Sequence, residues 1–126
     1  MVPVLLFDLV SQADRWLAAR QATIAENTAN VNTPGYKAQD ITPFADVLDN
    51  SQIGLTTTNP LHIALGPEDS ASPTFKDDDA WEVTLSGNSV SLEQEMIKAS
   101  DVNSAYSLNM SIIKAFNNMF MTSVKG

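Results

Sequence analysis

The sequence of 126 residues contains no cysteine and only one histidine, His62. Without cysteine there can be no disulfide framework, no thiol nucleophile and no thiolate metal site. Any triad or zinc site at His62 would depend on carboxylates alone, so we expect a structural role for this residue. The glycines at positions 54, 66 and 87 stand singly and form no phosphate-binding loop. The sequence therefore predicts no catalytic residue, no cofactor and no bound metal, and a protein that is not an enzyme. A small enzyme would need His62 to lie in a pocket with convergent carboxylates.

Basic residues are scarce: seven lysines and arginines stand against fifteen acidic residues, a net charge of -8. This balance argues against nucleic acid as a partner, because binding it requires cations that neutralise phosphates. Residues 34–90 carry nine acids and two bases, a net charge of -7, whereas both ends of the chain are almost neutral. Asp77, Asp78, Asp79 and Glu82 could bind a divalent cation, but they lack the spacing of a calcium loop, so an exposed loop is favoured.

No apolar run approaches the ~20 residues that are needed to cross a bilayer, so no transmembrane segment is expected. The short run at residues 2–7 has no preceding lysine or arginine and is followed by Asp8. A cleavable signal peptide is not expected either, and any export should use another route. Nothing in the composition points to a small-molecule substrate.

Glycine and proline are absent from residues 4–31 and 92–124, so each stretch is predicted to form one long helix. Apolar residues recur at steps of four and three in both stretches, as in a helix that packs along another helix. The first seam is Leu6, Val10, Ala13, Leu17, Arg20, Ile24, Asn27 and Val31. The second seam is Leu92, Met96, Ala99, Asn103, Tyr106, Met110, Ile113, Asn117, Phe120 and Val124.

The predicted fold is mainly α, with the two long terminal helices antiparallel in an elongated, coiled-coil-like stem and a small irregular β-containing insert. Residues 1–33 form the N-terminal arm, residues 34–90 the acidic insert with a turn, a short helix and short strands, and residues 91–126 the C-terminal arm. We expect the polar seam residues Arg20 and Asn103 to face each other and to set the register of the helices.

Apolar residues outside the seams, Trp16, Ile112, Phe116 and Met119, imply a partner beyond the second helix. A closed helical hairpin with some exposed apolar surface is the alternative. The side chains expected to pack subunits together are Leu6, Val10, Leu17, Ile24, Met96, Tyr106, Met110, Ile113, Phe116 and Phe120.

The first helix should stop near residue 31, because Pro34 disfavours helical geometry at Thr33. Pro34 and Gly35 fit the central positions of a type II turn, with a positive φ at Gly35. Asparagine amides at the helix end can satisfy free carbonyls or bond to the returning chain, although ordinary helix-end chemistry explains each one singly. The predicted turn motif comprises Asn27, Asn30, Thr33, Pro34, Gly35 and Tyr36.

Within the insert, Thr42 and Pro43 introduce a predicted short helix that extends to Leu48. Residues 61–65 and 81–85 alternate apolar and polar side chains and are predicted strands with one buried face. Residues 66–73 and 77–79 look like exposed loops, and residues 86–88 form a turn. Ser91 is the expected N-cap of the last helix, with Gln94 completing a capping box worth roughly 1 kcal/mol.

Two strings identify a family resemblance: RQATIAENTANVNTPGYKAQD at residues 20–40 and GNSVSLEQEM at residues 87–96. Together they resemble the signatures of bacterial flagellar basal-body rod proteins, with Ser91 at a position where an acidic residue is common. The resemblance covers both helical arms and only thinly the insert, where residues 55–63 look most like those of the proximal rod proteins.

The resemblance implies a structural subunit that polymerises through its terminal helices into a tubular drive shaft for flagellum-dependent motility. It also implies a location in the rod within the periplasm and export by the flagellar type III apparatus without a cleavable signal. The implied partners are further copies of the chain, other rod proteins, the rod-base adaptor, the membrane ring and the export gate. A sibling rod protein, or a helical-hairpin export adaptor or chaperone, is the alternative.

Phe44 and Leu48 match a loose pattern that, in rod and hook subunits, is linked with recognition at the export gate. A contact between these residues on one face of a short helix explains the same spacing.

Overall fold

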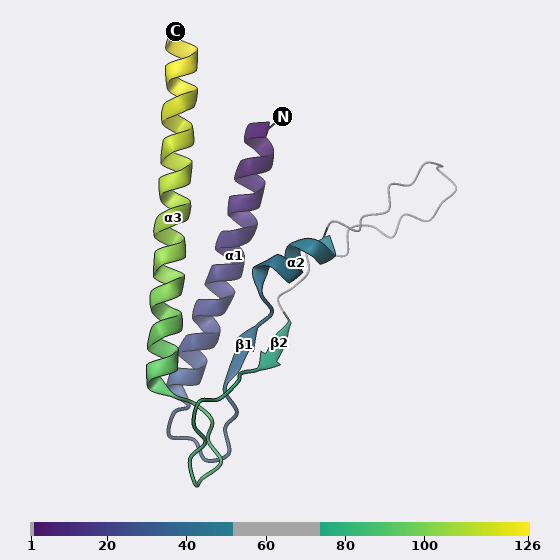
Figure 1. The fold of residues 1–126 in the computed structure, drawn as a ribbon, viewed down its shortest axis with the longest axis vertical. Helices are drawn as coiled ribbons and strands as arrows, with labels where there is room; N and C mark the ends of the chain where they lie inside the picture. The colour runs from purple at the N-terminus through teal and green to yellow at the C-terminus, as the bar shows by residue number, and fades with distance from the viewer. Residues whose placement is uncertain (1, 52–73) are drawn as a thin grey trace, which may run out of the picture.

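The computed structural model describes residues 2–51 and 74–126 (Figure 1). Helix α1 (Val2–Ala29) and helix α3 (Leu92–Lys125) run antiparallel as a stem, with both chain ends at the same end of it. Strands β1 (Gln39–Ile41) and β2 (Phe75–Asp77) lie towards the other end, and helix α2 (Phe44–Ser51) projects from the side of the stem. The predicted mainly α fold, with long terminal helices and a small β-containing insert, is confirmed. Within the described ranges, no helix combines the length and the apolar character that a membrane span requires.

The ends of the long helices agree with the sequence prediction to within two residues. Ser91 is the N-cap of α3, and its side chain accepts a hydrogen bond from the Gln94 N–H at 3.5 Å. The second half of the predicted capping box is wrong, because the Gln94 side-chain amide donates to the Asp79 carbonyl at 3.0 Å. The insert returns close to the start of α3 and supplies this carbonyl.

The α1 seam is confirmed, since each of its eight positions is buried or half-buried. Leu17 and Ile24 form a core with Val102 of α3, and Trp16, Ala99, Ala105 and Tyr106 pack against this core. In the first turns of α3, the buried residues lie on a different face from the predicted seam. Glu95, Lys98 and Val102 are buried there, whereas Met96 is 71% exposed. The predicted face is wrong because Glu95 and Lys98 turn inward to meet charges of the insert.

The expected contact between Arg20 and Asn103 is also wrong. The Arg20 guanidinium donates to the Asp40 carboxylate at 3.3 Å. Asn103 lies on the exposed side of α3. The register of the two helices is therefore set without this pair.

Strands β1 and β2 form an antiparallel pair in which Asp40 lies opposite Lys76 and Ile41 opposite Phe75. Neither strand was predicted, because three residues are too few to show alternation. The predicted strand at residues 81–85 is wrong: this segment has no strand partner within the described part of the chain and is exposed. The predicted loop at residues 77–79 is wrong in part, since Asp77 ends β2 and Asp78 is half-buried. Residues 61–65, including His62, and the predicted loop at residues 66–73 lie outside the described residues.

The turn after α1 is formed as predicted. The Tyr36 N–H donates to the Thr33 carbonyl at 3.2 Å, and φ at Gly35 is 73°. Gly35 also donates its N–H to the Ser86 carbonyl at 2.9 Å, which joins this turn to the one before α3. In that second turn Gly87 has a φ of 82°, and a Cβ placed there would lie 3.6 Å from the Gly35 Cα.

Replacing Gly35 with valine is expected to destabilise the chain by about 2 kcal/mol, because a β-branched residue resists positive φ. A Cβ at this position would meet no atom within 4 Å, so the effect is one of backbone strain alone. Gly35→Asn is the matched control, because asparagine tolerates this conformation. Urea denaturation of the purified variants measures the difference. Equal stability of the valine and asparagine variants would contradict this explanation.

Candidate assembly surface and the junction beneath it

Asn27 holds the chain that returns from the turn against the end of α1. This side chain is fully buried, and its amide donates to the Gln39 carbonyl at 2.7 Å. Its oxygen accepts hydrogen bonds from the Gln39 N–H at 3.0 Å and from the Tyr36 hydroxyl at 3.4 Å. The prediction that an asparagine amide bonds to the returning chain is confirmed here. Asn30 instead donates to the Glu26 carbonyl at 2.9 Å, which is ordinary helix-end chemistry.

Asn88 performs the corresponding role for the segment that leads into α3. Its buried amide donates to two carbonyls at the end of α1, Asn30 at 2.8 Å and Thr33 at 2.7 Å. Its oxygen accepts from the Val90 N–H at 2.8 Å. The sequence places Asn88 in a turn but carries no sign of this bridge. Asn88 thus satisfies two carbonyls just beyond the end of α1, whereas Asn27 satisfies the backbone N–H and C=O of Gln39 in the returning chain.

A charged cluster joins the insert to the stem. Lys98 of α3 contacts Asp78, which follows β2, and its ammonium lies 3.1 Å from the Glu95 carboxylate and 3.9 Å from that of Asp40 in β1. Asp40 also pairs with Arg20 of α1 at 3.3 Å. No sequence pattern indicates this cluster, because its members belong to four separate segments.

The pKa values of two groups near this junction are raised. Burial lowers the pKa of Lys98, but hydrogen bonds to Asp78 and Glu95, together with their negative charge, more than offset it. Burial raises the pKa of the Tyr36 hydroxyl, and the charges of Glu26 and Glu95 raise it further. Lys98 therefore stays charged and Tyr36 neutral well into the alkaline range.

Trp16 fixes the start of α2 against the stem. Its indole N–H donates to the Thr42 carbonyl at 2.7 Å, and its ring lies 6.0 Å from that of Phe44. The Arg20 guanidinium lies over the Trp16 ring, 5.5 Å from the ring centre. Trp16 was expected to face an additional partner, but it is satisfied within the chain. Phe44 and Leu48 lie on α2, which extends the predicted short helix to Ser51, and both are half-buried.

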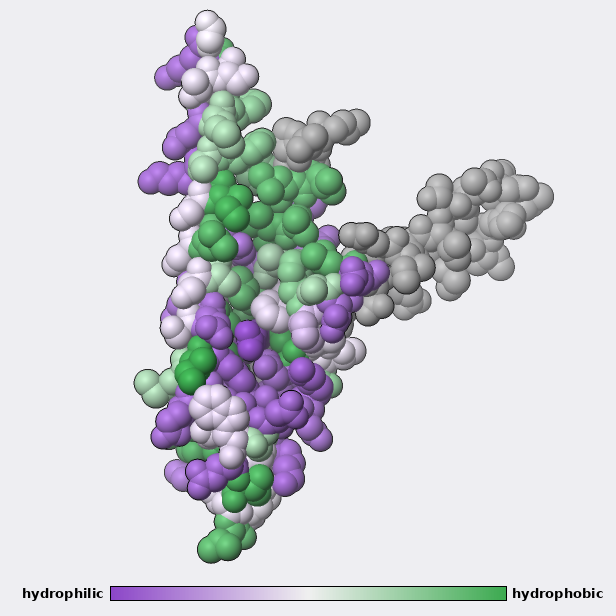
Figure 2. Space-filling view, in the orientation of Figure 1, coloured by the Kyte–Doolittle hydropathy of each residue, from purple (hydrophilic) through white to green (hydrophobic). Residues whose placement is uncertain are grey.

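The half of the stem that carries the chain ends has a different surface. Apolar side chains remain exposed along both helices there, and Figure 2 shows them as an almost continuous green area. The Phe7 and Phe116 rings pack edge to face between the helices at 5.7 Å. The exposed members of this surface, which we call the apolar flank, are Leu5, Phe7, Leu9, Leu108, Met110, Ile112, Met119, Phe120, Met121 and Val124.

The residues expected to pack subunits together divide into three groups. Val10, Leu17 and Ile24 are buried within the stem, and Leu6, Tyr106, Ile113 and Phe116 are half-buried. Met96, Met110 and Phe120 are exposed and free to contact another molecule.

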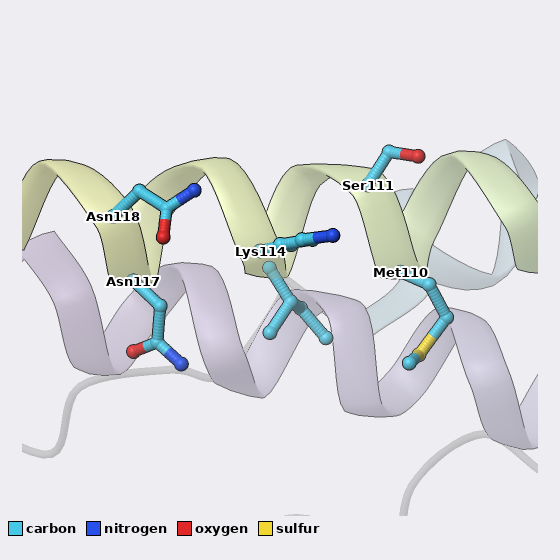
Figure 3. Close-up of a pocket in the computed structure, with 6 residues that line it drawn as sticks. Met110, Ser111, Lys114, Asn117 and Asn118 are labelled. Carbon is cyan, nitrogen blue, oxygen red and sulfur yellow. The ribbon is translucent and has the colours of Figure 1, made fainter.

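The α3 surface is also hollowed beside the apolar flank (Figure 3). This hollow has no set of side chains that could perform catalysis. In residues 2–51 and 74–126, no group of three or more histidine, cysteine or acidic side chains could hold a metal ion. The residues that line the hollow come from successive turns of one helix: Met110, Ser111, Ile113, Lys114, Asn117 and Asn118.

Comparison with known proteins agrees with these features. A family model described as flagella basal body rod protein matches residues 16–37, which include Arg20, Asn27 and Gly35. A flagellar basal body rod protein FlgB from Agrobacterium fabrum is 37% identical over 129 residues, covering 99% of this chain and 96% of the relative. The FlgB protein of Escherichia coli is 33% identical over 108 residues, covering 76% of this chain and 75% of the relative.

A further relative, FlgB of Salmonella typhimurium, is 29% identical over 105 residues, which is 76% of this chain and 75% of the relative. The chain is thus a structural protein of the flagellum and not an enzyme. It belongs to the FlgB family of flagellar basal body rod proteins.

Proposed function

We propose that the chain polymerises through its apolar flank, packing against further copies and other rod proteins to build the proximal rod as a tubular drive shaft. The observation that carries this proposal is the run of exposed apolar side chains on both helices. Full burial of each large apolar side chain contributes roughly 1.5–3 kcal/mol, so a few of them stabilise a subunit contact.

The charge distribution supports close packing of the stems. Between Asp101 and Lys114, α3 carries no charged residue, so neighbouring helices there meet without charge repulsion. The two helices of one stem contribute different parts of the flank, which favours contacts between unlike surfaces of successive copies. Such contacts extend into a helical assembly instead of closing into a small ring.

The finer partners and location follow from the same proposal. The rod lies in the periplasm, and its base meets the rod-base adaptor, the membrane ring and the export gate. The chain reaches the rod through the flagellar export apparatus. If the export gate binds Phe44 and Leu48, α2 must first be released from Trp16, because the Phe44 ring packs on the Trp16 ring. Recognition would then precede folding of the insert.

Immunogold labelling of purified basal bodies tests the proposal. An antibody raised against the chain is expected to label the rod close to the membrane ring, and a strain without the gene is expected to be non-motile and to lack a complete rod. Restoring the gene should restore both. Basal bodies without label, combined with normal swimming of the deletion strain, would contradict the proposal.

A further inference from the structure

The segment at residues 81–85 has the sequence of a strand but no strand partner among residues 2–51 and 74–126. Trp81, Val83 and Leu85 alternate with Glu82 and Thr84, and Leu85 is 110% exposed and Trp81 66% exposed. Three apolar side chains in one alternating row are seldom left in water unless something covers them. The segment therefore has the composition of a half-buried strand but lacks the sheet.

The backbone of this segment is free along one edge. The Thr84 N–H donates to the Asn88 carbonyl at 2.9 Å, and the Thr84 carbonyl accepts from the Gly87 N–H at 2.9 Å. In the part of the chain that the structure describes, no hydrogen bond involves the N–H or C=O of Trp81 or Val83. Successive backbone groups of a strand point to opposite sides. When residues 81–84 are extended, Trp81 and Val83 therefore present their groups away from Asn88.

Strand β2 offers a second free edge. The Thr42 N–H bonds to the Thr74 carbonyl at 3.0 Å, and the Asp78 N–H bonds to the Ala38 carbonyl at 3.0 Å. Thr74 and Asp78 thus direct their backbone groups towards β1. Because successive residues of a strand point to opposite sides, the backbone N–H and C=O groups of Phe75 and Asp77 point away from β1. All three β2 residues are exposed, and the two-stranded sheet ends there. Among the described residues, no strand pairs with this edge of β2.

We propose that the segment at residues 81–85 of one copy adds as an antiparallel strand to the free edge of β2 in a second copy of this chain. Val83 then lies opposite Phe75, and Glu82 lies opposite Lys76. This inference rests on the proposed function, which brings copies into contact.

Three observations favour this occupant and this register. Glu82 and Lys76 are exposed, carry opposite charge and have no ion-pair partner among the described residues. Val83 falls on the same sheet face as the exposed Phe75 ring, so both are covered together. Trp81 and Val83, whose backbone groups are free, lie opposite Asp77 and Phe75, whose groups point outward.

The same chain cannot supply this strand to itself. Only residues 78–80 separate β2 from the segment, and Asp78 is held by Lys98 while the Asp79 carbonyl is held by Gln94. The strand must therefore come from another molecule. Each copy carries one donor segment and one acceptor edge at different places, so the contact can repeat along an assembly without closing.

Disulfide trapping tests the register, because the natural chain has no cysteine. The double variant Phe75→Cys with Val83→Cys is expressed in cells that lack the natural gene, and purified basal bodies are oxidised. Residues opposite each other in a hydrogen-bonded antiparallel pair have Cα atoms about 5.5 Å apart, which a disulfide can span. We expect a ladder of linked multimers on a non-reducing gel and no multimer beyond a dimer for either single variant.

The pair Phe75→Cys with Thr84→Cys is the matched control, because Thr84 projects to the opposite face and should give no ladder. In the trapping variant, adding Lys76→Glu or Glu82→Lys should lower the yield of ladder about fivefold, and adding both should restore it. Variant basal bodies that contain the protein but give no ladder, or an equal ladder from the control, would overturn the inference while leaving the proposed function intact. Absence of the natural protein from basal bodies would instead refute the proposed function.

Discussion

Replacing Phe120 with aspartate is expected to abolish rod assembly and swimming, while the purified chain should keep the far-UV circular dichroism spectrum of the natural protein. Phe120 is 52% exposed on α3, so the isolated fold does not depend on it. In the assembly this position lies in the proposed interface, where an unpaired carboxylate loses its hydration at a cost of several kcal/mol. Motility in soft agar and counts of complete basal bodies measure the effect.

Phe120→Leu is the matched control and should swim normally, because it keeps an apolar side chain of similar size. Phe116→Asp is a less specific variant, since the Phe116 ring packs on Phe7 within the stem and its loss also weakens the fold. Normal swimming of the Phe120→Asp strain would argue against packing through the apolar flank.

Replacing Lys98 with methionine is expected to destabilise the chain by about 3–5 kcal/mol. Methionine fills much of the same space but leaves the carboxylates of Glu95 and Asp78 without their shared cation. Glu95 is 2% exposed, and one of its carboxylate oxygens has no hydrogen-bond partner, so the lost charge is not replaced. Urea denaturation at neutral pH measures the change, with Lys98→Arg as the control that retains the charge. A methionine variant as stable as the natural chain would show that the cluster contributes nothing net.

The pH dependence of the same measurement gives an independent check. The folded pKa values of Lys98 and Tyr36 are raised above their ordinary values of 10.5 and 10.0. The stability that these groups contribute is therefore fully present below about pH 10 and is lost as pH rises through the folded pKa values. The Lys98→Met variant should keep only the part of this alkaline loss that belongs to Tyr36. An unchanged alkaline slope would rule out the role assigned to Lys98.

The features that were predicted correctly depend on short stretches of sequence. Pro34 and Gly35 define a turn by themselves, and the absence of helix breakers defines α1 and α3. The Asn27 bridge could be anticipated because its partner lies only twelve residues away. The buried face of α3 could not, because Asp78 draws Lys98 inward from twenty residues away in the sequence. Apolar periodicity alone placed Met96 inside, whereas charge pairing with the insert placed Glu95 and Lys98 there.

The strands were predicted wrongly for a related reason. Residues 81–85 have a strong strand pattern, but a strand needs an edge to pair with, and the contacts of Asp78 and Asp79 keep this segment away from the free edge of β2 in its own chain. Strands β1 and β2 are held by Trp16, Arg20 and Lys98, which contact them or the residues beside them. Their formation is a result of tertiary contacts that no three-residue pattern could indicate.

The charged cluster also has a mechanical meaning. Arg20 connects the insert to α1, and Lys98 connects it to α3, so a twisting force applied to the insert reaches both helices together. The Asn88 bridge ties the segment that leads into α3 to the end of α1, so it resists sliding of one helix past the other. A force on the insert is therefore shared between the two helices and does not bend one of them alone.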